Sequence, residues 1–351
     1  MSQLWSPTVR ELTPYVPGEQ PRERLIKLNT NENPYPPAPG VEAVLREFPA
    51  DHLRLYPDPE SRALRQALAR EYGVETEQVF VGNGSDEVLA LAFQAFFCQG
   101  RPLEMPAITY SFYPVYCRLY GIERRTRPLD EQWRVDLDAF SADSAGVIFA
   151  NPNAPTAHGH SRDAISALLE RITERVVLVD EAYVDFGGES VVPLVASHPN
   201  LLVTGTFSKS RSLAGLRLGY AIGSRELIEG LERVKDSFNS YPIDSLASAI
   251  GIAALEDREY FDACRGKVIT TRERTVKRLK ELGFETLPSQ ANFLLVEHPD
   301  FDAAQLFVGL RERGILVRHF NTEELRNFLR ISIGTDDEMD SLVEVLETLC
   351  G

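Results

Sequence analysis

A lysine between two serines is the first residue in this sequence whose type and setting indicate chemistry. Lys209 follows the apolar segment 201–206 and has Ser208 and Ser210 on either side. Burial lowers the pKa of a lysine amine, and a neutral amine attacks carbonyl carbon atoms. Lys209 is therefore a candidate for capturing a carbonyl group. The alternative is a solvated loop lysine, which is what most lysines are.

Two more charged residues adjoin apolar segments. Asp180 directly follows VVLV, where a buried carboxylate is costly unless a cationic partner lies nearby. Tyr183 comes three residues later and is expected near the same strand end. Arg217 lies 8 residues after Lys209 between two leucines, a setting in which a guanidinium typically serves an anion. For Asp180, a helix N-cap or a loop ion pair is the alternative interpretation.

Two turns present further polar groups. Asn153 lies in N-P-N-A-P-T (151–156), where the prolines restrict the backbone that carries it. Ser85 and Asp86 lie in a glycine turn (82–87) between a predicted strand and a predicted helix, where free N–H groups can bind phosphate. That turn lacks the G-K-[ST] of a Walker motif and the full glycine pattern of a dinucleotide site. An ordinary turn and a helix cap remain the alternatives.

Composition narrows the class of protein. The 351 residues are 43% hydrophobic and 25% charged, as is usual for soluble globular chains. The net charge of −15 argues against a nucleic-acid partner. The sequence has neither an apolar run long enough for a membrane span nor a secretory signal. The four cysteines form no C-x-x-C pair, which predicts no disulfide framework, no metal site and a cytoplasmic location.

The apolar segments predict the scaffold that positions these residues. Continuous apolar runs at 146–150, 176–180, 201–206 and 218–223 are typical of strands covered on both faces. Helix-length segments separate them, so we expect an α/β fold with a mostly parallel sheet flanked by helices. In such sheets the ligand lies at the carboxyl ends of the strands, which is where the polar residues are.

We expect three parts in the chain. Residues 1–49 are Pro-rich and predict an extended arm that packs against the last part. Residues 50–260 form the large domain. Residues 261–351 alternate short apolar segments with helices, which suits a smaller α+β domain. A long helical region over 242–282 is expected to break near Asp257.

In this order the motifs resemble those of the fold-type-I pyridoxal phosphate (PLP) enzymes. The spacings agree, with 27 residues from Asn153 to Asp180 and 29 from Asp180 to Lys209. Seven segments resemble, more narrowly, the histidinol-phosphate aminotransferase family: N-T-N-E-N-P-Y, R-L-Y-P-D-P, T-Y-S-F-Y, N-P-N-A-P-T, F-S-K-S-R-S-L-A-G-L-R-L-G-Y, A-N-F and L-R-I-S-I-G-T. The resemblance implies PLP-dependent transamination between L-histidinol phosphate and 2-oxoglutarate, giving imidazole-acetol phosphate and glutamate in histidine biosynthesis.

The resemblance also implies roles for individual residues. Lys209 would hold PLP covalently and move a proton between substrate and cofactor, while Asp180 would pair with the pyridinium nitrogen. Other residues would contact the ring face (Tyr110), the phenolic oxygen (Asn153 and Tyr183) and the phosphate (Ser85, Asp86, Thr206, Ser208 and Arg217). Tyr56 in R-L-Y-P-D-P would reach the PLP phosphate of the partner subunit, which implies a homodimer.

Substrate recognition is expected from Arg330, with Arg318 nearby. One planar guanidinium can bind both the phosphate of histidinol phosphate and a carboxylate of glutamate. A strand-end ion pair is the alternative for Arg330, and a surface charge for Arg318. Asn31 and Tyr15, on the arm, are expected to close over the substrate.

Other functions stay open at this point. An aromatic amino acid aminotransferase or a threonine-phosphate decarboxylase would use the same cofactor residues. A PLP-binding regulator without catalysis is a further class, but it usually carries a DNA-binding module, and the residues before the large domain contain no helix-turn-helix pattern. The turn after N-P-N-A-P-T departs from the family pattern, and we interpret its His158 and His160 as loop residues.

Overall fold

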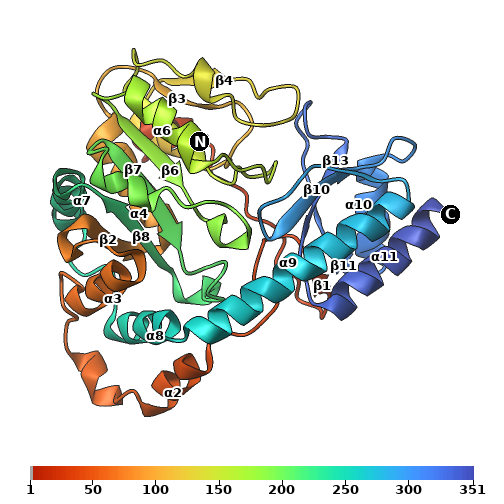
Figure 1. Cartoon of the computed structure of the whole chain (residues 1–351), viewed down its shortest axis with the longest axis horizontal. Coiled ribbons are helices and arrows are strands. Elements are labelled where there is room, and N and C mark those ends of the chain that lie inside the picture. Colours follow the sequence, from red (N-terminus) through yellow and green to blue (C-terminus); the bar gives the residue numbers. More distant parts are fainter. Residues whose placement is uncertain (1–2) are drawn as a thin grey trace.

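In the computed structural model, which describes residues 3–351, seven strands form the larger of the main sheets (Figure 1). Their order across the sheet is β2-β8-β7-β6-β5-β3-β4. All pairs from β4 to β7 are parallel, whereas β8 is antiparallel to both neighbours, so the predicted mostly parallel sheet is confirmed. The strands are β2 (Val79–Asn83), β3 (Leu103–Pro106), β4 (Arg124–Arg127), β5 (Gly146–Ala150), β6 (Val176–Asp180), β7 (Leu201–Thr206) and β8 (Leu218–Gly223).

Helices cover both faces of this sheet, as the continuous apolar runs predict. Successive side chains of a strand point to opposite faces, so Val177 and Val179 of β6 join one buried cluster while Leu178 joins the other. The first cluster is closed by α3 (Arg62–Tyr72), α6 (Arg162–Arg171) and α8 (Ser245–Glu256). The second is closed by α4 (Gly84–Ala92), the π-helix Phe93–Phe97, α5 (Tyr113–Tyr120) and α7 (Arg225–Phe238).

A single long helix joins the two sheets. The predicted break in the helical region lies at Asp257, which ends α8 and whose carboxylate accepts a hydrogen bond from the Tyr260 N–H as the N-cap of α9 (Arg258–Glu281). Figure 1 shows α9 running diagonally from the side of α8 to the smaller sheet. The predicted domain boundary after residue 260 falls inside the first turn of α9, and the boundaries stay a prediction.

The smaller sheet is antiparallel, in the order β12-β13-β10-β9. Its strands are β9 (Glu285–Thr286), β10 (Phe293–Glu297), β12 (Arg318–His319) and β13 (Phe328–Ser332), with α10 (Ala303–Glu312) and α11 (Asp336–Cys350) packed on them. Thr335 and Glu338 form a capping box that starts α11. This α+β unit matches the expected fold class.

The N-terminal arm contacts the α+β unit through a two-stranded parallel pairing of β1 (Ile26–Lys27) with β11 (Ile315–Leu316). Before β1 the arm forms the short helix α1 (Pro7–Glu11), and after it α2 (Pro39–Glu47), which packs on α8. Among residues 3–351 no helix has the length and apolarity that crossing a bilayer requires. Short 3-10 helices complete the fold at Ala50–Arg54, Thr76–Gln78, Leu137–Ala139, Val184–Phe186, Val192–Ala196 and Ala214–Leu216.

Candidate active site

Asp180 ends β6 as a buried carboxylate without a cationic partner among residues 3–351. Tyr113 Oη donates to its Oδ2 at 2.9 Å, and the Ala182 N–H donates to Oδ1 at 3.2 Å. Burial raises the Asp180 pKa to about 6 despite these two hydrogen bonds. A buried carboxylate in this state is stabilised by a cation placed against it, so the site fits a protonated ring nitrogen.

Lys209 lies in the loop that follows β7, and its amine points toward the N-terminal arm. Its Nζ donates to the backbone carbonyl oxygen of Thr30 at 3.2 Å and lies 5.8 Å from the centroid of the Tyr183 ring. The side chain is half-buried, so the amine is both held and reachable. Asn33 binds the main chain of the same loop, with its Nδ2 3.1 Å from the Lys209 carbonyl oxygen.

The glycine turn and Arg217 meet at the start of α4. Arg217 donates from Nη2 to Asp86 Oδ2 at 2.7 Å, and Tyr110 Oη donates to Asp86 Oδ1 at 3.1 Å. A Cβ on Gly84, which has a φ of +76°, would lie 2.5 Å from Arg217 Nη2, so only glycine leaves room for the guanidinium over the turn. Ser85 is in the first turn of α4, where helix N–H groups attract anions. This arrangement fits a phosphate.

Thr206 is the last residue of β7, which lies next to β8 in the sheet, and Ser208 follows two residues later. Thr206 Oγ1 donates to the Leu218 carbonyl oxygen at 3.3 Å and accepts from the Ser208 N–H at 3.1 Å. Both residues are buried. They adjoin Arg217 through β8, which pairs with β7 at the Thr206–Gly219 register. The structure therefore brings the predicted phosphate residues to one edge of the sheet.

Asn153 is completely buried, and the protein itself engages its side-chain amide. Its Nδ2 donates to the Ile108 carbonyl oxygen and to Thr156 Oγ1, both at 3.0 Å, while Oδ1 accepts from Thr109 Oγ1 at 2.9 Å. A hydrogen bond from Asn153 to a phenolic oxygen would have to replace one of the two that Nδ2 donates. The predicted role of Asn153 therefore depends on a rearrangement of this turn.

Tyr183 lies beside the arm. Asn31 Nδ2 donates to Tyr183 Oη at 3.1 Å, which leaves the phenol hydrogen available to another acceptor. Asn31 is buried, has a φ of +57°, and accepts from Ser332 Oγ at 2.9 Å through its side-chain oxygen. The two predicted residues are thus brought together, with Ser332 of β13 behind them.

Arg330 and Arg318 are cross-strand partners in the smaller sheet, and neither has a carboxylate partner in the described part of the chain. Arg330 donates from Nη2 to the Asn29 carbonyl oxygen at 2.8 Å, but its buried Nε has no hydrogen-bond partner. Burial lowers the pKa of the Arg330 guanidinium, and the neighbouring charge of Arg318 lowers it further. The strand-end ion pair considered for Arg330 is absent from residues 3–351, and the site fits a bound anion.

Aromatic side chains enclose the approach to Arg330. Its guanidinium carbon lies 5.5 Å from the ring centroid of Phe293 and 5.8 Å from that of Phe320. Tyr15 packs on Phe112 with ring centroids 5.0 Å apart, and Phe112 stacks on Tyr110 at 6.1 Å. The arm therefore contacts the Tyr110 loop through Tyr15 and Arg330 of β13 through the Asn29 carbonyl oxygen.

Three predicted positions lie apart from this cluster. Tyr56 is 83% exposed and stacks on Tyr241, with ring centroids 4.7 Å apart. His158 and His160 follow the Asn153 turn, and burial lowers the pKa of both imidazoles. They are loop residues, as expected, but partly buried ones.

Sequence reasoning missed several residues that hold the site. These are Tyr113 on Asp180, Thr109 on Asn153, Asn33 on Lys209, and Asn292 and Ser332 on Asn31. All of them lie inside the motifs that carry the family resemblance. Their place inside these motifs was the available signal.

Known proteins share both the sequence and the fold. A family model for class I and II aminotransferases matches residues 23–346. A histidinol-phosphate aminotransferase of Chromohalobacter salexigens is 76% identical over 350 residues, covering 100% of both chains. Histidinol-phosphate aminotransferase 1 of Bradyrhizobium diazoefficiens is 55% identical, over 99% of this chain and 100% of its own.

Solved structures of other proteins have the same fold as this chain. The histidinol-phosphate aminotransferase from Sinorhizobium meliloti, in complex with pyridoxal-5'-phosphate, superposes with a TM-score of 0.89 at 26% identity over 99% of both chains. An L-threonine-O-3-phosphate decarboxylase from Porphyromonas gingivalis superposes with a TM-score of 0.78 at 25% identity, over 93% of this chain and 99% of its own.

Proposed function

The chain belongs to the class I and II aminotransferase family, and we propose from this premise how its residues act. It is a PLP-dependent aminotransferase that exchanges an amino group between L-histidinol phosphate and 2-oxoglutarate, giving imidazole-acetol phosphate and glutamate in histidine biosynthesis. When bound, PLP supplies an electron-withdrawing ring that takes up the electron pair of the substrate C–H bond. The protein supplies the remaining steps.

One observation carries the assignment of substrate-binding roles. The Lys209 amine and the Arg330 guanidinium donate to neighbouring backbone carbonyls of the arm, those of Thr30 and Asn29. Since consecutive Cα atoms are about 3.8 Å apart, a reactive amine and a free anion-binding group lie within the length of one small molecule. This spacing suits a substrate that carries its amine near a terminal phosphate or carboxylate.

Lys209 is the group that moves the proton. An amine held beside the substrate can remove the Cα proton and return it to the cofactor, which is general acid–base catalysis worth about 10²–10⁴-fold. The bond to the Thr30 carbonyl oxygen fixes the direction of this amine when it is not covalently engaged. Tyr183 lies beside it and would offer a phenol hydrogen to an oxygen of a bound cofactor.

Asp180 is the group that keeps a ring nitrogen protonated. Tyr113 and the Ala182 N–H hold the carboxylate in one orientation. Because the carboxylate is buried, its interaction with a cation is screened less than it would be at the surface. The cofactor phosphate would be held by Thr206, Ser208, Arg217 and the N-terminus of α4. Since Arg217 donates to the Asp86 carboxylate in this structure, the phosphate would have to replace that carboxylate as its partner.

Arg330 is assigned to the substrate anion. Transamination needs two substrates in turn, one with a phosphate and one with carboxylates, and a guanidinium without a carboxylate partner among residues 3–351 can bind either. Arg318 adds a second positive charge on the neighbouring strand. Asn31 and Tyr15 would close over the substrate from the arm.

Tyr56 supports a homodimer. A Tyr56 that serves a PLP phosphate would serve that of a second copy, since in this chain it is 83% exposed and its ring stacks on Tyr241. Tyr241, on which Tyr56 stacks, is itself exposed, as are Leu53, Leu55 and Phe238 near the two tyrosines in the sequence. A contiguous exposed apolar surface is typical of an interface.

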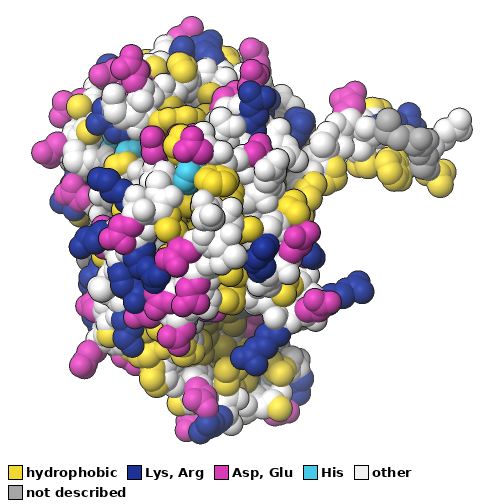
Figure 2. All heavy atoms as spheres, turned by 90° about the vertical axis from the view of Figure 1, so that its right-hand side faces the viewer, with side chains coloured by type: hydrophobic (Ala, Val, Ile, Leu, Met, Phe, Trp, Pro, Cys, Tyr) yellow, Lys and Arg dark blue, Asp and Glu magenta, His cyan; other side chains and the backbone are white. Residues whose placement is uncertain are grey.

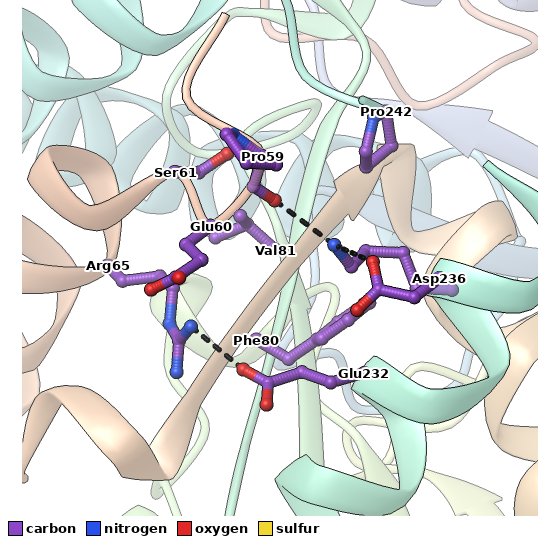
Figure 3. A pocket seen from close by; sticks show the side chains of 10 residues that line it. Pro59, Glu60, Ser61, Arg65, Phe80, Val81, Glu232, Asp236 and Pro242 are labelled. Atoms are coloured by element: carbon purple, nitrogen blue, oxygen red, sulfur yellow. Dashed lines mark hydrogen bonds and ion pairs between the residues drawn. The ribbon is translucent and has the colours of Figure 1, made fainter. Parts of the chain in front are cut away.

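A cavity of about 300 Å³ opens beside this surface, between α3, β2 and α7 (Figure 3). Its charged groups already have partners, since Arg65 pairs with Glu232 and Lys235 with Asp236. The Lys235 amine also donates to the Pro59 carbonyl oxygen at 3.0 Å. With its charges satisfied, the cavity does not compete with the Lys209 site as an anion site.

The N-terminal segment also projects from the body of the molecule with hydrophobic side chains along it (Figure 2). Among these, Trp5, Val9 and Val16 are exposed. They add to the apolar surface available to a second subunit. The cytoplasmic location stays a prediction.

A comparison of amino donors tests the proposed substrate. We expect the highest kcat/KM with L-histidinol phosphate, and lower values with phenylalanine and tyrosine, because their carboxylate brings less negative charge to Arg330 and Arg318 than a phosphate does. A preference for the aromatic donors would instead assign an aromatic amino acid aminotransferase. Release of CO₂ from threonine phosphate without amino transfer would assign the decarboxylase.

A further inference from the structure

We propose that Asn33 is a positioning residue that fixes Lys209 from the N-terminal arm. Its side-chain Nδ2 donates to the carbonyl oxygen of Lys209 at 3.1 Å and to that of Ser210 at 3.2 Å. Both acceptors belong to the main chain on which the reactive amine is mounted. The inference rests on the proposed function, in which Lys209 captures the cofactor.

The arm holds Lys209 at both of its ends. Thr30 accepts from the Lys209 amine, and Asn33 donates to the Lys209 carbonyl oxygen. A lysine side chain loses rotamer entropy when it is fixed. Since these contacts fix both the main chain and the amine before a reaction begins, less of that cost falls on the capture of the cofactor.

The arm can act as a frame because the smaller sheet anchors it. The Asn31 N–H donates to Ser332 Oγ at 2.8 Å, and Asn292 Nδ2 donates to the Asn31 carbonyl oxygen at 3.0 Å. Asn33 itself is oriented locally, since its Oδ1 accepts from the Tyr35 N–H at 3.1 Å. Its Nδ2 is thereby directed at the Lys209 loop.

Other contacts to the loop do not replace Asn33. The Ser212 N–H also donates to the Lys209 carbonyl oxygen, at 3.3 Å, but it belongs to the same loop and moves with it. Asp185 accepts from Ser210 Oγ at 2.5 Å and so holds a side chain rather than the Lys209 main chain. Asn33 is the contact that ties the main chain of Lys209 to the arm.

The test measures the capture of PLP by the apoprotein, through the limiting first-order rate at which the absorbance of lysine-bound PLP appears at saturating PLP. We expect Asn33→Ala to slow this rate about tenfold, since misplacing a reacting group by about 1 Å is costly. Asn33→Asp keeps an acceptor for the Tyr35 N–H but loses both donated bonds. It should therefore slow capture as Asn33→Ala does.

A matched control, Asn200, lies directly before β7, whereas Lys209 follows the other end of that strand. Asn200 also donates from Nδ2 to two backbone carbonyl oxygens, those of Ile172 at 2.6 Å and Arg175 at 2.9 Å. Asn200→Ala removes the same chemistry just before β7 begins, away from Lys209. It should lower the thermal midpoint of the apoprotein as Asn33→Ala does and leave the capture rate within about twofold of the unchanged protein.

The outcomes separate the two proposals. Slow capture in both Asn33 variants with near-normal capture in Asn200→Ala supports the positioning role. Normal capture in Asn33→Ala, or equally slow capture in Asn200→Ala, overturns it while the proposed function stands. An unchanged protein that never captures PLP would remove the proposed function, and this inference with it.

Discussion

The two halves of the active site are prepared to different degrees. On the larger sheet, Asp180, Asn153 and Arg217 each have protein partners that fix their side chains. On the smaller sheet, Arg330 and Arg318 face each other without any carboxylate among residues 3–351, and Arg330 Nε has no partner.

The difference suits what each half is proposed to bind. A cofactor that stays in place through every cycle can be met by side chains that the protein already orients, and it would replace one such hydrogen bond at Asn153 and one at Arg217. Two substrates that exchange at one place need a group that can pair with either anion and release it, which a guanidinium with an internal carboxylate partner would do poorly. The comparison predicts that changes to the first half abolish chemistry and changes to the second half alter substrate binding.

The largest effect is expected at Lys209. Lys209→Ala removes both the cofactor attachment and the proton carrier, so kcat should fall by about 10⁴-fold or more in a transamination assay. The thermal midpoint of the apoprotein should change little, because the amine makes a single hydrogen bond. Activity above one part in about a hundred of the unchanged enzyme would assign the proton transfer to another residue.

Asp180→Asn is expected to come next. The variant keeps a side chain of the same shape for the Tyr113 hydroxyl but loses the negative charge opposite the ring nitrogen. Breaking a buried charge pair costs about 3–5 kcal/mol, which corresponds to a fall of roughly 150- to 5,000-fold in kcat. The KM for L-histidinol phosphate should stay nearly unchanged. A rise in KM with normal kcat would place Asp180 in the substrate half instead.

Arg330→Gln should affect the other half. Hydrogen bonds to charged groups are worth about 1.5–3 kcal/mol, so kcat/KM should fall by about 10–10²-fold for both L-histidinol phosphate and glutamate. The absorbance spectrum of the bound cofactor should not change. Arg318→Gln serves as the comparison and should act in the same direction but less strongly. A loss confined to one substrate would contradict a shared anion site.

A smaller effect is expected from pH. The Asp180 pKa is raised from 3.8 to about 6 by burial, so the apoprotein favours the protonated form. The resulting stabilisation is fully present below about pH 4 and is lost as the pH rises through about 6. Relative to Asp180→Asn, the apoprotein should therefore lose about 1–3 kcal/mol of unfolding free energy over this range.

The same pH dependence measured on the PLP-loaded protein tests whether a cation lies against Asp180. A cation against Asp180 lowers its pKa, so the dependence between pH 4 and 6 should shrink or reverse in the loaded protein. Urea unfolding at several pH values, with and without PLP, measures it. The same pH dependence in both states would mean that no cation meets Asp180.

The scaffold could be predicted where burial leaves a continuous apolar pattern. The runs at 146–150, 176–180, 201–206 and 218–223 became β5 to β8 with those bounds. In the larger sheet, two strands were not predicted because charges interrupt them: β4 reads RRTR, and β3 contains the buried Glu104. Glu104 forms ion pairs with Arg125 and Arg127 of β4, so these charges are satisfied by tertiary contacts that no local pattern reveals.

The candidate site was likewise predictable from local sequence patterns but not in its tertiary contacts. Residue types and their place after strands identified Lys209 and Asp180, because parallel strands bring their carboxyl ends together. The hydrogen bond from Asn33 to the Lys209 carbonyl oxygen joins residues 176 positions apart. The hydrogen bond from Asn153 to the Ile108 carbonyl oxygen depends on the packing of a separate loop. Contacts of this kind exist only once the arm and the two sheets have assembled.

The central claim is that one site holds PLP at Lys209 and accepts both anionic substrates in turn. The most direct measurement is the absorbance spectrum of the PLP-loaded protein as L-histidinol phosphate and then 2-oxoglutarate are added. We predict that the band of the lysine-bound cofactor disappears with the first and returns with the second. A band that ignores L-histidinol phosphate but responds to phenylalanine would contradict the substrate assignment, and the absence of any such band would contradict the role of Lys209.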